Sequence, residues 1–237
     1  MATAEHIPNR ARFYIASVAV AGLALLAAGV MRWESANPLF YLTFLALALL
    51  GATRKIRLPR MTGTVSLNFL FILVGVVEFG FAETLVMGCS AALLQSIWKP
   101  RRQPRPVQLV FNVATMAISI TAAYWGAHIA LAAAPAKCEP LLLIVATSLL
   151  LVTNTGLVAG VLALTEAKPF GGVWKHCYAC VFPYFLVGGA LAGFVCASSH
   201  SVGWQYSLLV LPLAYLLYLF YQLRLERVTG EQGRLAA

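Results

Sequence analysis

Two glutamates that flank a short turn are the residues of this sequence best placed to do chemistry. Glu78 and Glu83 are separated by Phe-Gly-Phe-Ala and stand where two apolar runs meet. Ionisable groups at membrane depth commonly mark proton or ion sites, so this pair is a candidate for taking up a proton or a cation. The alternative is that both carboxylates lie at the outer membrane interface, in contact with water.

His128, Asn112 and Asn154 are the other candidates for sensing a proton or a ligand. His128 stands near the outer end of an apolar run, and the two asparagines lie within such runs, next to small residues. Buried amides in membrane proteins commonly hydrogen-bond across helices, so a structural role is the alternative for both. If the Glu78–Glu83 turn faces the bundle interior, we expect a polar cavity to reach from it towards Asn112 or Asn154.

Residues for catalysis or for a bound metal are scarce. The chain has no aspartate, which excludes a Ser-His-Asp triad, and it lacks phosphate-loop and dinucleotide-binding fingerprints. Glu34, Glu139 and His200 fall on the same predicted side as Glu78, but their spacings are not those of metal ligands. The His176-Cys177-x-x-Cys180 stretch has no second Cys-x-x-Cys to complete a zinc site. We therefore expect no enzymatic activity, no metal and no cofactor.

The composition indicates the scaffold that must position these residues. Of the 237 residues, 61% are hydrophobic and 11% are charged, and the mean hydropathy is +0.82. Globular chains have about 45–50% and about 25%, so a water-soluble fold is excluded. No run alternates as the strands of an outer-membrane barrel do. The sequence predicts an all-α polytopic membrane protein with eight transmembrane helices, within Phe13–Met31, Ser35–Thr53, Val65–Val77, Phe81–Trp98, Val107–Ala134, Leu141–Leu164, Tyr178–Ser198 and Gln205–Leu223.

Positive charges predict how these helices are oriented. If all eight runs cross the membrane, 15 of the 17 Lys and Arg residues fall on one side, and only Arg32 and Lys137 fall on the other. Cytoplasmic loops carry the excess of Lys and Arg, so both termini are predicted to be cytoplasmic. The chain then consists of a cytoplasmic tail over residues 1–12, a single membrane bundle over 13–223, and a cytoplasmic exit helix and tail over 224–237.

The stretch from Val65 to Trp98 is compatible with one long helix or with two short ones. A single crossing would place the basic loops before and after it on opposite sides, so the charges favour two passes. The 13 residues from Val65 to Val77 span only about 20 Å, less than the roughly 30 Å of a hydrocarbon core. We therefore expect a short helical hairpin at the third and fourth helices, with its turn below the outer surface.

Two basic loops are predicted to contact lipid and to fix the topology. One carries Arg54, Lys55, Arg57 and Arg60, and the other carries Lys99, Arg101, Arg102 and Arg105. Basic residues beside a membrane attract anionic lipids by about 1 kcal/mol each. Nucleic-acid binding needs an accessible basic surface with base-reading or stacking groups, so we expect membrane lipids as partners and no nucleic acid.

Two pairs of glycines have the spacing that lets helix backbones approach closely. They are Gly156 with Gly160, and Gly189 with Gly193. Such pairs mediate either helix dimers or contacts within one chain, and we expect contacts within the chain here.

About a third of the chain, from about Leu58 to Tyr124, carries a set of short motifs. They are Thr62-Gly63-Thr64-Val65-Ser66-Leu67-Asn68-Phe69, Glu78, Glu83-Thr84-Leu85, Gln95-Ser96-Ile97-Trp98, Arg102, Pro104 to Pro106 and Val110-Phe111-Asn112-Val113-Ala114. This pattern resembles the multi-helix membrane input region that precedes GGDEF or HD-GYP domains in some bacterial signalling proteins. The closing stretch from Tyr221 to Arg227 resembles the exit helix that leads such a region into its output domain.

The resemblance implies cyclic di-GMP signalling downstream of the membrane bundle. The sequence departs from that family at its end, because the residues from Leu225 to Ala237 are too few for a cyclase or phosphodiesterase domain. No catalytic or ligand-binding residue of the family can therefore be placed on this chain. By this resemblance the chain is either the membrane region of a longer signalling protein or a stand-alone relative.

Two functions compete on these observations. The first is a sensory domain in the bacterial cytoplasmic membrane that perceives a ligand, a proton or a lipid state. It would relay that state through its C-terminal helix to a cytoplasmic output domain or to a homodimer partner. The alternative is a small transporter or substrate-binding membrane component, in which the short hairpin forms the discontinuous element that such proteins use.

Overall fold

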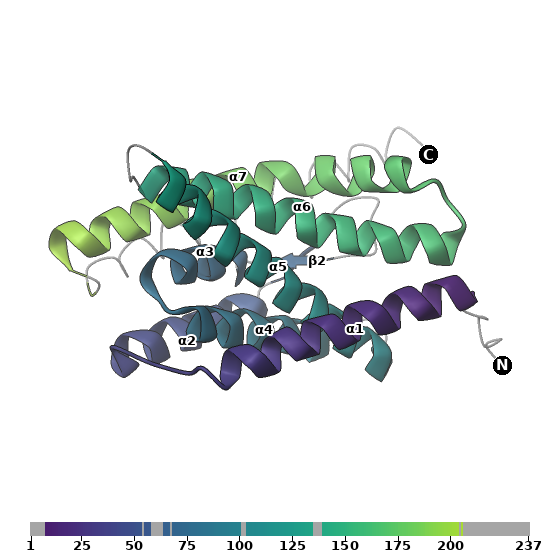
Figure 1. Ribbon diagram of the computed structural model, residues 1–237, viewed down its shortest axis with the longest axis horizontal. Helices are drawn as coiled ribbons and strands as arrows, with labels where there is room; N and C mark the ends of the chain where they lie inside the picture. Colours follow the sequence, from purple (N-terminus) through teal and green to yellow (C-terminus); the bar gives the residue numbers. More distant parts are fainter. Residues whose placement is uncertain are drawn as a thin grey trace, which may run out of the picture.

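The computed structural model describes residues 8–53, 55–57, 64–66, 68–100, 103–134, 139–203 and 205 (Figure 1). These residues form seven helices: α1 (Asn9–Val30), α2 (Pro38–Thr53), α3 (Asn68–Glu78), α4 (Phe81–Ile97), α5 (Pro106–Ala133), α6 (Glu139–Glu166) and α7 (Phe170–Val202). Two short strands, β1 (Lys55–Arg57) and β2 (Thr64–Ser66), pair antiparallel between α2 and α3, with Ile56 opposite Val65. The prediction of a helical protein is confirmed, with this small hairpin added.

Four helices, α1, α5, α6 and α7, are long and apolar enough to cross a membrane. Helices α2, α3 and α4 are shorter, with 16, 11 and 17 residues. The short third helix was expected, and it spans about 16 Å. The eighth apolar run, Gln205–Leu223, lies outside the described residues apart from Gln205, as do most of the predicted tails.

Helix α7 begins at Phe170 rather than at the predicted Tyr178. Pro169 stands immediately before it, where a fixed φ angle favours the start of a helix. The exposed Lys175 and His176 lie inside the helix. The sequence prediction excluded them because they interrupt the apolar run, but a helix can extend beyond the hydrocarbon core, where such side chains meet water.

Consecutive helices run in opposite directions, which gives the bundle two ends of different charge. Contacts at one end join Glu78 of α3, Glu139 of α6 and His200 of α7; we call this the acidic end. Contacts at the other end join the first turns of α1 to the last turns of α6, where Tyr14 bonds to Leu157; we call this the basic end. In Figure 1 the start of α1 and the connection from α6 to α7 lie at the same, right-hand end.

Helix α3 lies at the centre of the bundle. Its residues from Asn68 to Val76 are all buried, and it packs against α2, α4, α6 and α7. The ring of Phe69 stacks on Phe185 of α7 with ring centroids 4.6 Å apart. A helix that is apolar on all sides is typically enclosed by protein, so the short hairpin is built into the core.

Glycines bring several helices into close contact. A Cβ atom at Gly22 of α1 would lie 2.4 Å from the Cα of Ala114 in α5, and one at Gly160 of α6 would lie 2.5 Å from the Tyr14 hydroxyl. A Cβ at Gly189 of α7 would lie 3.1 Å from Oγ1 of Thr147 in α6. The expectation that the glycine pairs serve contacts within the chain is confirmed for Gly160 and Gly189.

Candidate functional site

The side chain of Glu78 meets a histidine at the acidic end. Glu78 is the last residue of α3, and its side chain is only 9% exposed. The Nε2 atom of His200, near the end of α7, lies 3.4 Å from its Oε1 atom. The Nδ1 atom of the same ring lies 2.9 Å from Oε1 of Glu139, the first residue of α6. One imidazole therefore contacts carboxylates from two other helices; we call this arrangement the His200 bridge.

The His200 bridge is partly open to solvent. His200 is 50% exposed and Glu139 is 46% exposed, whereas Glu78 is almost enclosed. Among the described residues, Oε1 of Glu78 has no hydrogen-bond partner, so its contact with the imidazole is electrostatic. A protonated His200 is attracted by both carboxylates, whereas a neutral ring has one N–H and can donate to only one of them. The arrangement can therefore couple the protonation of one exposed ring to the packing of three helices.

Glu83 has a different partner from Glu78. It lies in the first turn of α4 with 4% of its surface exposed, and its Oε2 atom accepts a hydrogen bond of 3.0 Å from the backbone N–H of Gly80. A carboxylate at this position satisfies a free donor and interacts favourably with the helix dipole. Glu83 thus holds the turn between α3 and α4, and both glutamates face the protein, as expected for an inward-facing turn.

Thr84 adds a second clamp across the same turn. Its hydroxyl donates to the carbonyl of Gly75 in α3 at 2.7 Å and approaches the carbonyl of Gly80 at 3.0 Å. Tyr124 of α5 donates to the carbonyl of Phe79 at 3.4 Å. The backbone of the turn is therefore fixed by side chains from α4 and α5, which is how a non-helical segment is tolerated inside a membrane protein.

His128 lies beside this turn without joining the glutamates. Its ring stacks on Tyr124 with centroids 4.3 Å apart, and its Nδ1 atom lies 2.8 Å from the Tyr124 carbonyl oxygen. In the part of the chain that the structure describes, no hydrogen bond or ion pair links His128 to Glu78 or Glu83. Its role there is to pack against the tyrosine that holds Phe79.

The structure does not bring Asn112 or Asn154 to the glutamates. Asn112 is exposed and donates from Nδ2 to Oγ of Ser96 in α4 at 3.1 Å, near the basic end. It precedes Tyr124 by about 18 Å along α5, and Asn154 follows Glu139 by about 22 Å along α6. The prediction of a polar cavity that reaches from the turn to these amides is therefore wrong, because the length of each helix separates the asparagines from the glutamates. Asn112 has the structural role named as its alternative.

Four of the predicted lipid-contact residues, Lys55, Arg57, Lys99 and Arg105, are among those that the structure describes. Lys99 and Arg105 are exposed on either side of the link between α4 and α5, and Lys55 and Arg57 form β1. Arg54, Arg60, Arg101 and Arg102 lie outside the described residues. Cys177 is buried, while nothing is described of the Cys180 side chain. Across the described ranges, no three His, Cys or Glu side chains are arranged to hold a metal ion.

Sequence reasoning missed the pairing of His200 with Glu78 and Glu139. Sixty-one residues separate Glu139 from His200, so no local spacing signals their contact. The available signal was topological, since all three residues stand at helix ends on the same predicted side. A search for opposite charges at matching helix ends would have found the bridge.

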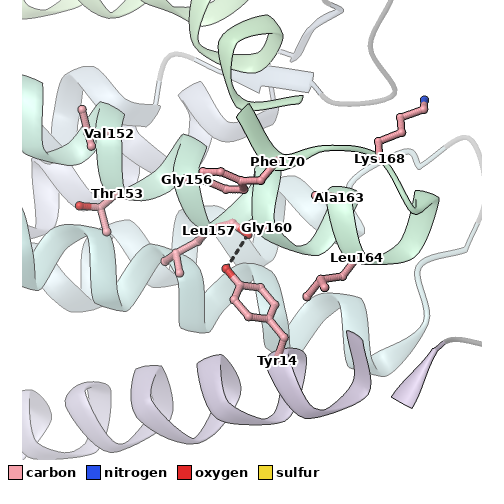
Figure 2. A pocket seen from close by; sticks show the side chains of 10 residues that line it. All are labelled: Tyr14, Val152, Thr153, Gly156, Leu157, Gly160, Ala163, Leu164, Lys168 and Phe170. Carbon is pink, nitrogen blue, oxygen red and sulfur yellow. Dashed lines mark hydrogen bonds between the residues drawn. The ribbon is translucent and has the colours of Figure 1, made fainter. Parts of the chain in front are cut away.

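A second feature, a groove, lies at the basic end between α1, α6 and the start of α7 (Figure 2). Its volume is about 560 Å³. The Tyr14 hydroxyl crosses from α1 to α6 and donates to the Leu157 carbonyl at 3.1 Å. The lining residues are Tyr14, Val152, Thr153, Gly156, Leu157, Gly160, Ala163, Leu164, Lys168 and Phe170.

Comparison of the chain with protein-family models, with curated proteins and with solved structures finds no match. The resemblance to the input regions of cyclic di-GMP signalling proteins is therefore untested and stays a prediction.

Proposed function

We propose that this chain is an integral membrane sensory domain in which the His200 bridge responds to protons. The observation that carries the proposal is the contact of one half-exposed imidazole with carboxylates from α3 and α6. Imidazole is the side chain whose charge ordinarily changes between pH 5 and 8. A bundle whose helices are joined through such a ring has a proton-dependent contact at its surface.

The proton-dependent contact reaches the core through α3. A protonated His200 holds Glu78 and Glu139 at once, whereas the neutral ring carries a single N–H and can hold only one of them. The groups that face the ring are Glu78 from α3 and Glu139 from α6, with Cys196 of α7 beside Glu78. Because α3 is buried on all sides, a shift of Glu78 changes the packing of the helices around it.

The proposed orientation places the acidic end outside and the basic end in the cytoplasm. Arg10, Lys99, Arg105 and Lys168 are all at the basic end, which agrees with the excess of Lys and Arg in cytoplasmic loops. With eight crossings of a bacterial cytoplasmic membrane, both termini are cytoplasmic. Reporter fusions at Gly63 and Gln103 should both report the cytoplasm, and opposite locations would contradict the two-pass hairpin.

The decisive test of proton sensing is a label at position 224, where the sequence predicts the exit helix to begin. A spin or fluorescent label at Arg224→Cys in reconstituted protein should change its environment between pH 5 and 8. His200→Gln should abolish the change, because the amide cannot become cationic, and Glu78→Gln should weaken it.

His128→Gln is the matched control, since His128 also lies at the acidic end but contacts neither glutamate in the described chain. It should leave the response intact. A response that survives in His200→Gln, or that both histidine variants lose equally, would contradict proton sensing through the bridge.

A small transporter is the second candidate, favoured by one observation. The 11-residue helix α3 is enclosed by other helices and ends in a turn fixed by side chains, as expected of a discontinuous membrane element. Proton-coupled solute flux into proteoliposomes that is lost in Glu78→Gln would favour this function over sensing.

A further inference from the structure

We propose that the groove at the basic end holds one acyl chain of an anionic phospholipid, with the lipid phosphate beside Lys168. The inference requires that the chain lies in a membrane, but it does not depend on the proposed sensory function. The groove and the His200 bridge are at opposite ends of the bundle. The two proposals can therefore fail separately.

The dimensions of the groove fit a chain from one leaflet. Its lining residues on α6 extend from Val152 to Leu164, which is about 18 Å along a helix. Half of a hydrocarbon core is about 15 Å thick. The volume of about 560 Å³ lies within the range of about 300–1,000 Å³ that is typical of ligand clefts. A single acyl chain lying along α6 matches this length.

The walls of the groove are suited to hydrocarbon. Leu157, Leu164 and Ala163 line it from α6, and Phe170, half exposed, lines it from the first turn of α7. The Tyr14 hydroxyl is already bonded to the Leu157 carbonyl, so the ring presents its apolar face. An apolar ligand loses no hydrogen bonds on entering such a site.

Positive charge lies at one end of the groove. Lys168 lines that end, and Arg10 stands one turn before Tyr14 on the same face of α1. Glu166 pairs with Lys168 at 2.6 Å and offsets one of the two positive charges, so the net charge at this end of the groove is positive. Lys and Arg bind phosphate through charge-assisted hydrogen bonds. This end of the groove therefore favours an anionic headgroup, at the level where the hydrocarbon region ends.

Gly156 gives independent support for an occupant. A Cβ atom at Gly160 would strike Tyr14, which explains that glycine, but a Cβ at Gly156 would meet nothing within 4 Å in the described structure. Packing among the described helices therefore does not require glycine at 156. Because residue 156 has no side chain, the groove is wider at the middle of the wall that α6 forms.

Photocrosslinking in vesicles tests the proposal. The full chain is reconstituted with phosphatidylglycerol that carries a diazirine on its acyl chain, and labelled peptides are located by mass spectrometry. We expect labelling concentrated on Tyr14 and on residues 152–164. Gly156→Leu should remove this labelling by filling the groove, while Gly171→Leu, at a glycine that also has nothing within 4 Å, should retain it.

The headgroup contact is tested with Lys168→Gln. The ratio of labelling by the phosphatidylglycerol probe to labelling by a phosphatidylcholine probe should fall about fivefold, as expected for the loss of one cationic contact. Labelling spread evenly over exposed residues such as Leu186 and Phe194 of α7 would overturn the proposal. So would crosslinks showing that residues 206–237 or a second copy of the chain fill the groove.

Discussion

The two ends of the bundle join their helices in different ways. At the acidic end, ionisable side chains from three helices meet in the His200 bridge, and polar side chains clamp the turn between α3 and α4. At the basic end, α1 and α6 are joined through Tyr14 and a glycine, and a groove stays open beside them. The difference indicates that polar contacts close one end while close backbone approach determines the shape of the other.

The largest expected effect is at the backbone contact of α1 with α5. Gly22→Leu should lower the free energy of unfolding by about 3 kcal/mol, the upper range for overpacking, because a Cβ there would lie 2.4 Å from the backbone of Ala114. Denaturant titration in micelles, followed by circular dichroism, measures the loss.

Gly156→Leu is the matched control for this prediction. A Cβ there meets no described residue within 4 Å, so the free energy of unfolding should change by less than about 1 kcal/mol. Equal losses in the two variants would mean that close backbone approach does not hold α1 against α5.

A smaller effect is expected at the acidic end from Glu83→Ala. This change removes the hydrogen bond that the buried Glu83 carboxylate accepts from the N–H of Gly80, which should cost about 2 kcal/mol of unfolding free energy, as is typical of a bond to a charged group. Glu83→Gln keeps an acceptor oxygen and should lose less. If the alanine variant unfolds at the same denaturant concentration as the wild type, the turn is not held by this carboxylate.

Thr84→Val tests the other clamp with a side chain of similar shape. The carbonyl of Gly75 still accepts a bond from the N–H of Phe79, so no backbone group is left unpaired. The expected loss is therefore only about 1 kcal/mol, measured by the same titration. A loss larger than that of Glu83→Ala would mean that Thr84 stabilises the turn more than Glu83 does.

Much of the fold could be predicted because apolar runs and charge follow general rules along the chain. The run from Val65 to Trp98 was divided correctly into two helices, since the basic residues on either side required it. The start of α7 was missed because Lys175 interrupts the apolar pattern without interrupting the helix. The cavity expected near Asn112 was wrong because the sequence does not show which part of α5 lies beside the turn: it is Tyr124, which contacts Phe79, whereas Asn112 contacts Ser96 of α4. The His200 bridge depends on contacts between residues far apart in sequence, and hydropathy contains no information about them.

The smallest expected effect is that of Tyr14→Phe at the basic end. It removes the hydrogen bond of 3.1 Å to Leu157, and contacts of this kind between membrane helices average about 0.6 kcal/mol. The Leu157 carbonyl keeps the hydrogen bond of its own helix, and the phenylalanine ring keeps the wall of the groove. The denaturation midpoint should therefore shift only slightly, and the photolabelling of residues 152–164 should persist.

A second substitution makes this small effect measurable. In the wild type, a Cβ at Gly160 would lie 2.5 Å from the Tyr14 hydroxyl oxygen and 2.8 Å from the ring carbon that bears it. Gly160→Ala should cost less in the Tyr14→Phe background, because the nearest atom has been removed, and the coupling should be about 0.5–1 kcal/mol. Strictly additive losses would show that Tyr14 and Gly160 do not touch. Tyr14 would then join α1 to α6 through its hydrogen bond to Leu157 and not through contact with Gly160.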